Sequence, residues 1–209
     1  MAAPVKIAVL VSGNGSNFQA IVDAIESGRI PNAQIVCLIS NKNDAYALQR
    51  AENHRIPHLV INHRDYADRR AYDTAVVHEL QKRGVTLVVL AGFMRILSPV
   101  MIDSFPNAIM NIHPALLPAF PGLDAQQQAL DYGVRYTGCT VHFVDSGTDT
   151  GPIIQQAVVP VLPDDTIDSL TQRIHGEEHR VYVEAVSLYC QGRLSVQGRL
   201  VKITATNDI

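Results

Sequence analysis

A carboxamide and an imidazole lie two residues apart at the end of an apolar segment, as Asn111 and His113. Side chains two positions apart on a β-strand point to the same face of the sheet. Side by side, both groups can donate hydrogen bonds to an oxyanion that develops during a reaction. The pair is therefore a candidate catalytic site, and the alternative is that both are structural polar residues where a strand enters a loop. The Leu117-Pro118 bond is a candidate cis peptide that would fix this loop.

The segment from Asp145 to Pro152 contains two glycines, the acids Asp145 and Asp149, and no large apolar side chain. This composition is typical of a turn. An aspartate from this turn that lay against His113 would hold the ring in one orientation and favour the imidazolium. A solvated turn without a catalytic role is the alternative.

A possible anion site follows the first apolar segment, in Ser12-Gly-Asn-Gly-Ser-Asn17. Glycines allow a tight turn here, and the free amides at the start of the next helix favour an anion. The dinucleotide fingerprint is incomplete, because Phe18 replaces its third glycine and the second strand ends in Ser40-Asn41 without an acid. The Gly-Lys-Ser/Thr of a Walker loop is also missing. We expect a single phosphate held by the amides and the Ser16 hydroxyl; the alternative is a tight strand–helix turn with Asn17 as the cap.

Composition argues against several other classes of function. The formal charge of -3 and the pI near 6.2 give no basic bias, so nucleic acid is an improbable partner. Three cysteines, Cys37, Cys139 and Cys190, are far apart and odd in number, which fits small buried side chains in a reducing compartment. The eight histidines show no metal-ligand spacing, and the acids show no calcium-loop pattern. We therefore expect no metal.

The apolar run Ile7–Val11 is too short for a signal peptide or a membrane span, so we expect a first strand, no membrane contact and a cytoplasmic location.

The elements that must position these residues follow a repeated pattern in the first half of the chain. Apolar strands alternate with helices, which favours a parallel sheet covered on both faces. We predict an α/β fold with a doubly wound, mostly parallel, Rossmann-like sheet. The expected strands are 6–11, 33–40, 57–61 and 85–91, and the expected helices are 17–27, 45–53 and 65–83.

The second half has a different character. The expected strands are 108–112, 139–144 and 153–161, with helices at 98–105, 124–132 and 166–191 and a terminal hairpin within 194–203. Asp164 to Thr166 is a predicted cap for the last helix. Because there is no linker, repeat or low-complexity segment, we predict one domain over residues 1–209.

Four segments, taken in order, resemble the glycinamide ribonucleotide formyltransferases of the folate-dependent formyltransferase family. They are Val11-Ser-Gly-Asn-Gly-Ser-Asn17, Leu90-Ala-Gly-Phe-Met-Arg-Ile-Leu-Ser98, Asn111-Ile-His-Pro-Ala-Leu-Leu-Pro118, and Val141-His-Phe-Val-Asp145 with Asp149-Thr-Gly-Pro152. The resemblance implies the formyltransferase fold. It also implies transfer of the formyl group of 10-formyltetrahydrofolate, a co-substrate, to the amine of glycinamide ribonucleotide in purine (IMP) biosynthesis.

The same resemblance implies roles for individual residues. The catalytic trio would be Asn111, His113 and Asp149, with Asp149 keeping His113 charged. In the implied division of the domain, the N-terminal half binds the nucleotide and the C-terminal half binds folate and catalyses. The residues that would bind the ribonucleotide are Gly15, Ser16, Asn17, His175, Gly176, Glu177 and Glu178. The residues that would bind folate are Arg69, Met94, Arg95, Ile96, Leu97, Asn111, Asp145, Ser146, Gly147, Thr148 and Asp149.

One departure from the family pattern concerns Asp124 and Gln126, where many members have histidines that help to order the catalytic loop. Because of this departure, the resemblance does not predict the pH optimum of the reaction. The alternatives are a 10-formyltetrahydrofolate hydrolase, a transfer-RNA formyltransferase, or a non-catalytic folate or nucleotide module. The first two usually carry an extra domain, for which we expect no room in this chain. The sequence does not distinguish a monomer from a homodimer.

Overall fold

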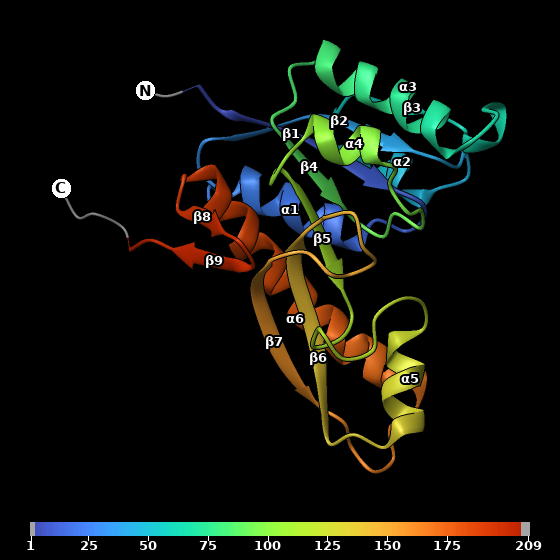
Figure 1. Cartoon of the computed structure of the whole chain (residues 1–209), viewed down its shortest axis with the longest axis vertical. Coiled ribbons are helices and arrows are strands. Elements are labelled where there is room, and N and C mark those ends of the chain that lie inside the picture. The colour runs from blue at the N-terminus through green and yellow to red at the C-terminus, as the bar shows by residue number, and fades with distance from the viewer. Residues whose placement is uncertain (1–2, 206–209) are drawn as a thin grey trace.

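A computed structural model describes residues 3–205, which form one sheet of nine strands with helices packed on both faces (Figure 1). The predicted domain of residues 1–209 extends beyond these residues at both ends. The strand order is β3-β2-β1-β4-β5-β6-β7-β9-β8. The strands are β1 (Val5–Val11), β2 (Ala33–Ser40), β3 (His58–Val60), β4 (Leu87–Leu90), β5 (Ile109–His113), β6 (Tyr136–Phe143), β7 (Ile153–Pro160), β8 (Leu194–Gln197) and β9 (Leu200–Ile203).

The sheet is parallel from β3 to β5 and changes direction beyond it. Strands β2, β1 and β4 are apolar and largely buried, as strands covered by helices on both faces must be. β6 pairs antiparallel with β5, and β7 pairs antiparallel with β6. The prediction of an α/β fold with a doubly wound, mostly parallel sheet is therefore confirmed.

Two hydrophobic clusters lie on the two faces of this sheet. One joins the sheet to the first and last helices, and the other joins it to the helices that flank β4. The helices are α1 (Ser16–Glu26), α2 (Tyr46–Asn53), the short 3-10 helix η1 (His63–Asp65), α3 (Arg69–Lys82), α4 (Pro99–Ser104), α5 (Ala125–Tyr132) and α6 (Ile167–Cys190). Within residues 3–205, no helix combines the length and the apolar character needed to cross a membrane.

Several predicted boundaries were wrong by a few residues. α3 begins at Arg69 and not at residue 65, because Asp68 forms its N-cap and its side chain accepts a hydrogen bond from the Ala71 N–H at 2.8 Å. β6 begins three residues earlier than predicted, since Tyr136 already pairs with Pro160 of β7. The predicted cap of α6 is confirmed, as Thr166 forms a capping box with Ser169.

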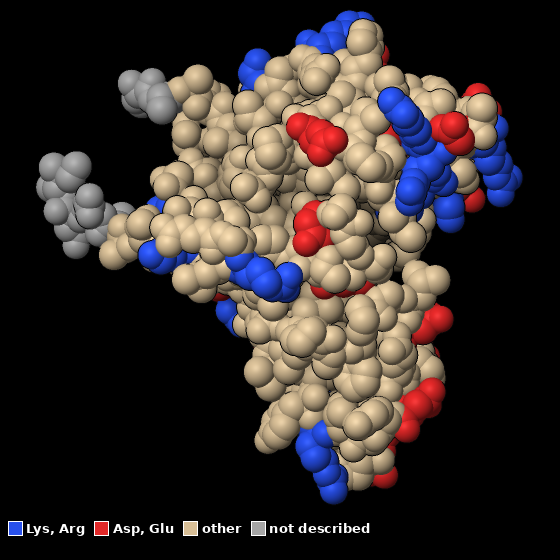
Figure 2. Space-filling view, viewed as in Figure 1, with Lys and Arg blue, Asp and Glu red and all other residues tan. Residues whose placement is uncertain are grey.

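The chain ends in the predicted hairpin, in which β9 joins the sheet beside β7 through a single parallel bridge. At the other side of the fold, β6, β7, α5 and part of α6 extend away from the parallel sheet (Figure 1). Figure 2 shows that the visible face over this extension carries few charged side chains, while lysines and arginines gather around the start of α3. Arg64, Arg69 and Arg70 are exposed in that part of the chain.

Candidate active site

Asn111 and His113 lie on β5, where the sheet changes from parallel to antiparallel. Their positions in the register are opposite His142 and Thr140 of β6. Residues directly opposite each other in an antiparallel pair share a face, so four polar side chains gather on one side of the two strands. The sequence located two of these residues and gave no role to His142.

Asp149 completes this polar group from the turn between β6 and β7. Its Oδ2 lies 3.4 Å from His113 Nδ1, and its Oδ1 lies 3.7 Å from His142 Nε2. The Gly122 N–H donates a hydrogen bond of 2.8 Å to Asp149 Oδ2. The backbone of Asp149 has a φ of 55°, a left-handed conformation that only a fixed environment maintains in a non-glycine residue. The structure thus brings Asn111, His113 and Asp149 together.

The ring of His113 faces an acceptor at each nitrogen. Nε2 donates to the carbonyl oxygen of Phe120 at 2.8 Å, while Nδ1 faces Asp149. A carbonyl oxygen can only accept, so Nε2 carries a hydrogen, and Nδ1 faces a carboxylate that can accept a hydrogen bond from it. We expected His113 to donate a hydrogen bond directly to an oxyanion. For this, the Nε2–H must give up its hydrogen bond to the Phe120 carbonyl and donate to the oxyanion instead. The loop that carries this carbonyl begins with Leu117-Pro118, which is cis as proposed.

His142 fixes the orientation of Asn111. Its Nδ1 donates to the Phe143 carbonyl at 2.9 Å, so its Nε2 accepts a hydrogen bond from Asn111 Nδ2 at 3.2 Å. Burial lowers the pKa of His142, which keeps the ring neutral and preserves this acceptor. The carboxamide nitrogen of Asn111 is thereby held toward β6, and its second N–H is left for a ligand.

The predicted anion loop joins β1 to α1 and contacts α6. Gly15 is the N-cap of α1, with a φ of 73°, and Asn17 lies inside the helix. Asn17 Nδ2 donates to Glu178 Oε2 at 3.1 Å, while its own Oδ1 is buried with no partner within residues 3–205. Asn17 is therefore not the cap, which was the alternative for this segment. Its side chain connects the loop to α6 instead.

The second ligand segment that sequence resemblance indicated, 175–178, lies on α6. Glu178 is buried, and that burial raises its pKa. His175 Nε2 lies 4.0 Å from Glu178 Oε2, whereas Glu177 pairs with Arg180 at 2.6 Å. His175 and Gly176 are exposed. The structure thus places Glu178 against the anion loop and His175 beside Glu178, while Glu177 pairs with Arg180.

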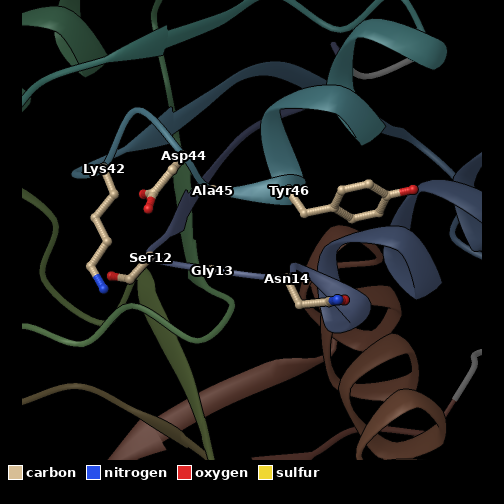
Figure 3. A pocket seen from close by; sticks show the side chains of 7 residues that line it. All are labelled: Ser12, Gly13, Asn14, Lys42, Asp44, Ala45 and Tyr46. Carbon is tan, nitrogen blue, oxygen red and sulfur yellow. The ribbon is translucent and has the colours of Figure 1, made fainter.

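A hollow of about 290 Å³ lies on the other side of the anion loop, where the loops after β1 and β2 meet. Figure 3 shows the side chains that line it, which are Ser12, Gly13, Asn14, Lys42, Asp44, Ala45 and Tyr46. Arg50 of α2 holds the loop here, since its guanidinium donates to the carbonyl oxygen and to Oδ1 of Asn14 at 3.0 and 3.1 Å. Sequence reasoning did not find Arg50, because no local pattern relates α2 to the loop.

The predicted folate segment 94–97 follows β4 and lies against the anion loop. Ser12 makes two of the connections, because its Oγ accepts from Met94 N–H at 2.9 Å and its N–H donates to the Gly92 carbonyl at 3.1 Å. Met94 and Ile96 expose 69% and 62% of their surface, while Leu97 is buried. Two exposed apolar side chains beside a polar loop provide a surface that a flat aromatic ligand can cover.

The remaining predicted folate residues lie in the β6–β7 turn and at the start of α3. Asp145 Oδ1 accepts hydrogen bonds from Gly147 N–H at 3.0 Å and from Thr150 Oγ1 at 2.6 Å, so this carboxylate closes its own turn. Ser146, Gly147 and Thr148 are exposed at the turn, and Arg69 is exposed as the first residue of α3.

Asp124, where the sequence departs from the family pattern, is exposed at the N-cap of α5 with a φ of 55°. Within the described chain its side chain makes no capping hydrogen bond. Across residues 3–205 there is also no group of three or more His, Cys, Asp or Glu residues that could hold a metal ion.

Comparison with known proteins identifies the family. The sequence model of the family described as formyl transferase matches residues 5–186, which is most of the chain. The chain belongs to the formyl transferase family. The ligand loops and the polar group on β5 lie inside the matched range.

Individual members of the formyl transferase family match almost all of the chain. It is 43% identical to the phosphoribosylglycinamide formyltransferase of Haemophilus influenzae over 195 residues, which are 93% of this chain and 92% of that one. It is 50% identical to the trifunctional purine biosynthetic protein adenosine-3 of Drosophila melanogaster over 188 residues, and spans only 14% of that protein. The crystal structure of glycinamide ribonucleotide transformylase 1 from Symbiobacterium toebii superimposes with a TM-score of 0.96 at 50% identity, covering 98% of this chain and 96% of that one.

Proposed function

We propose that this protein transfers the formyl group of 10-formyltetrahydrofolate to the amine of glycinamide ribonucleotide, a step of purine biosynthesis. The observation that carries the proposal is the gathering of Asn111, His113 and Asp149 at the carboxyl end of β5. The anion loop follows β1 and the exposed apolar segment follows β4, and these strands adjoin in the order β1-β4-β5. Open α/β sheets bind ligands at these ends.

The ribonucleotide occupies the N-terminal half of the domain in this proposal. Its phosphate lies on the backbone amides of Gly15, Ser16 and Asn17, at the positive end of α1. Glu178, held by Asn17, accepts hydrogen bonds from the ribose hydroxyls, and His175 lies beside it. The 175–178 segment of α6 thereby forms one wall of the nucleotide site, with Gly176 and Glu177 on its solvent side.

The folate occupies the side of the site formed by the segments after β4 and after β6. Its ring lies against Met94, Arg95, Ile96 and Leu97 and is bound by their backbone groups. The turn from Asp145 to Asp149, including Ser146, Gly147 and Thr148, covers the ring. Arg69, exposed as the first residue of α3, faces the anionic glutamate tail.

The chemistry needs no covalent intermediate on the protein and no metal. The neutral amine of the ribonucleotide attacks the formyl carbon, and the formyl oxygen becomes an oxyanion. Asn111 donates its free N–H to this oxyanion, and protonated His113 donates Nε2–H after exchanging the Phe120 carbonyl. Asp149 keeps His113 charged and positions a water that carries the proton from the attacking amine to N10 of the folate. The carbon–N10 bond then breaks, and tetrahydrofolate leaves.

We place this reaction in the cytoplasm, on small-molecule substrates alone. The test is an assay of purified protein with 10-formyltetrahydrofolate, with and without glycinamide ribonucleotide. Release of tetrahydrofolate that depends on the ribonucleotide, with formylated product, supports the transferase. Equal release without the ribonucleotide would identify a hydrolase, and binding without turnover would identify a non-catalytic module.

A further inference from the structure

A fully buried carboxylate of α3 contacts the end of the segment 94–98, and it is not one of the predicted site residues. Asp73 of α3 is 0% exposed, and its Oδ2 accepts a hydrogen bond of 2.5 Å from the backbone N–H of Ser98. Its other oxygen, Oδ1, has no hydrogen-bond partner within residues 3–205. Burying a carboxylate is costly, and within the described chain Asp73 has no salt-bridge partner that would offset this cost. An apolar side chain at this position would avoid that cost but would leave the buried Ser98 N–H without its acceptor.

The residue next to Asp73 contacts the same segment. The guanidinium of Arg95 lies 4.8 Å above the ring of Tyr72, which is 0% exposed. Arg95 Nε and Ser98 Oγ are also buried without partners in the described part of the chain. Polar groups of α3 and of the segment thus meet in a buried layer beneath the surface formed by Met94 and Ile96.

These contacts determine how the segment is held. Ser12 binds its first residue through Met94 N–H, Tyr72 supports its middle through Arg95, and Asp73 binds Ser98 at its end. Ser98 is also the N-cap residue of α4, so the same contact fixes where the segment ends and the helix begins. A charge-assisted hydrogen bond to a backbone N–H is about twice as strong as a neutral one. Of the three side chains that hold the segment, Ser12, Tyr72 and Asp73, only Asp73 is a carboxylate.

We propose that Asp73 is a positioning residue for the folate co-substrate, because its carboxylate sets the path of the backbone 94–98 that binds the folate ring. This inference rests on the proposed function. Asp73 is too deeply buried to touch the ligand, so its effect passes through Ser98. Loss of this carboxylate leaves the anion loop in place, because Arg50 and Glu178 hold the loop through contacts that do not involve residues 94–98.

The test compares Asp73→Ala and Asp73→Asn with Val76→Ala, a control on the same helix. Val76 is 1% exposed in the core cluster on this face, so its truncation destabilises α3 while the hydrogen bond between Asp73 and the Ser98 N–H stays in place. We expect KM for 10-formyltetrahydrofolate to rise about tenfold in Asp73→Ala, the equivalent of one hydrogen bond to a charged group. Asp73→Asn, which keeps a neutral acceptor, should show a smaller rise of about threefold. KM for the ribonucleotide should stay within about twofold of wild type in both variants.

The outcomes distinguish a role of Asp73 in positioning the folate from a role in stability alone. If Val76→Ala raises the folate KM as much, or if both substrates are affected equally, Asp73 acts only through stability and the proposal is wrong. If Asp73→Ala does not fold, Asp73→Asn decides, and an unchanged folate KM in that variant overturns the proposal. Absence of formyl transfer by the wild-type protein would instead contradict the proposed function.

Discussion

At the scale of single residues, the site depends on which atom of each side chain carries a proton. Asn111 can serve an oxyanion only if its Nδ2 is directed correctly, and the neutral ring of His142 supplies the acceptor that directs it. Within the polar group on β5 and β6, His142 therefore acts through Asn111. Ligand-binding groups are commonly positioned by partners of this kind.

A double-mutant cycle tests this dependence. Asn111→Ala should lower kcat by about 10²–10³, the usual cost of losing one oxyanion donor. His142→Phe, which keeps the bulk of the ring and removes the acceptor, should lower kcat by about tenfold. The double variant should be no slower than Asn111→Ala alone, since His142 has nothing left to orient. Additive losses in kcat would show that His142 acts independently.

Glu178 illustrates the cost of a buried binding group. Burial raises its pKa, so the folded state holds the proton more tightly than the unfolded state does. Folding is then penalised as pH rises above the ordinary value of 4.5, where the unfolded chain ionises first, and the penalty is absent well below that pH. Removing the charge should therefore stabilise the protein at neutral pH.

Glu178→Gln should raise the melting temperature, with a larger gain at pH 7.5 than at pH 5. The glutamine carbonyl can still accept the hydrogen bond from Asn17, so Nδ2 of Asn17 keeps its partner. KM for the ribonucleotide should rise, a loss of function that accompanies the gain in stability. Thermal melts of both proteins at the two pH values provide the measurement. A melting temperature that falls, or an equal gain at both pH values, would contradict the sign argued here.

At the scale of elements, the anion loop contains two glycines that differ in backbone conformation and in the space around them. Gly15 has a φ of 73°, and an added Cβ would lie 2.6 Å from Cβ of Ala47 on α2. Gly13 has an ordinary φ, and an added Cβ would meet nothing within 4 Å. No local sequence pattern shows that Gly15 is the obstructed one of the two, and a larger side chain such as valine at Gly15 would mainly cause misfolding.

Gly15→Ala should cost about 1–3 kcal/mol of stability, because the methyl group is both strained and obstructed. Gly13→Ala is the matched control and should leave the free energy of unfolding within about 0.5 kcal/mol of wild type. Urea unfolding of both variants makes the comparison. Equal stability of the two would mean that α2 does not press on the loop as the structure shows.

The elements themselves were largely predictable, because their signals are local. Apolar runs gave the strands and Thr166 marked the start of α6. The predicted start of α3 was too early. Residues His63–Asp65 form a separate 3-10 helix, and α3 begins only after its N-cap residue, Asp68. Asp124 occupies the N-cap position of α5 with a left-handed backbone, and within the described chain its carboxylate makes no capping hydrogen bond.

At the scale of the whole molecule, what the sequence could not supply is register between distant strands. Asn111 lies opposite His142 only because β6 runs antiparallel to β5, and no pattern within either strand specifies that pairing. The hydrogen bonds between Arg50 and Asn14 and between Ser98 and Asp73 likewise join residues of different elements. Residues in local motifs were found by sequence, whereas residues that act across the fold required the structure.

α6 connects these distant parts, and Tyr182 is the clearest case. This tyrosine is fully buried, and its hydroxyl lies 3.0 Å from the Leu90 carbonyl and 2.9 Å from the Met110 carbonyl. One turn earlier on the same helix, Glu178 binds Asn17. A single helix thereby links the end of β4 and the start of β5 to the anion loop.

Tyr182→Phe should lower the stability of the whole molecule more than it lowers catalysis. The change leaves two buried carbonyl oxygens without this donor, which should cost about 1–2 kcal/mol, or about 2–8 °C in melting temperature. Tyr189→Phe is the control, since its hydroxyl donates to Thr86 at 3.2 Å in an exposed setting and should matter little. β5 remains paired with β4 and β6 in either variant, so kcat should stay near wild type. A normal melting temperature with a large loss of kcat would mean that the Tyr182 hydroxyl supports the catalytic role of Asn111. It would also mean that its hydrogen bonds to Leu90 and Met110 contribute little to stability.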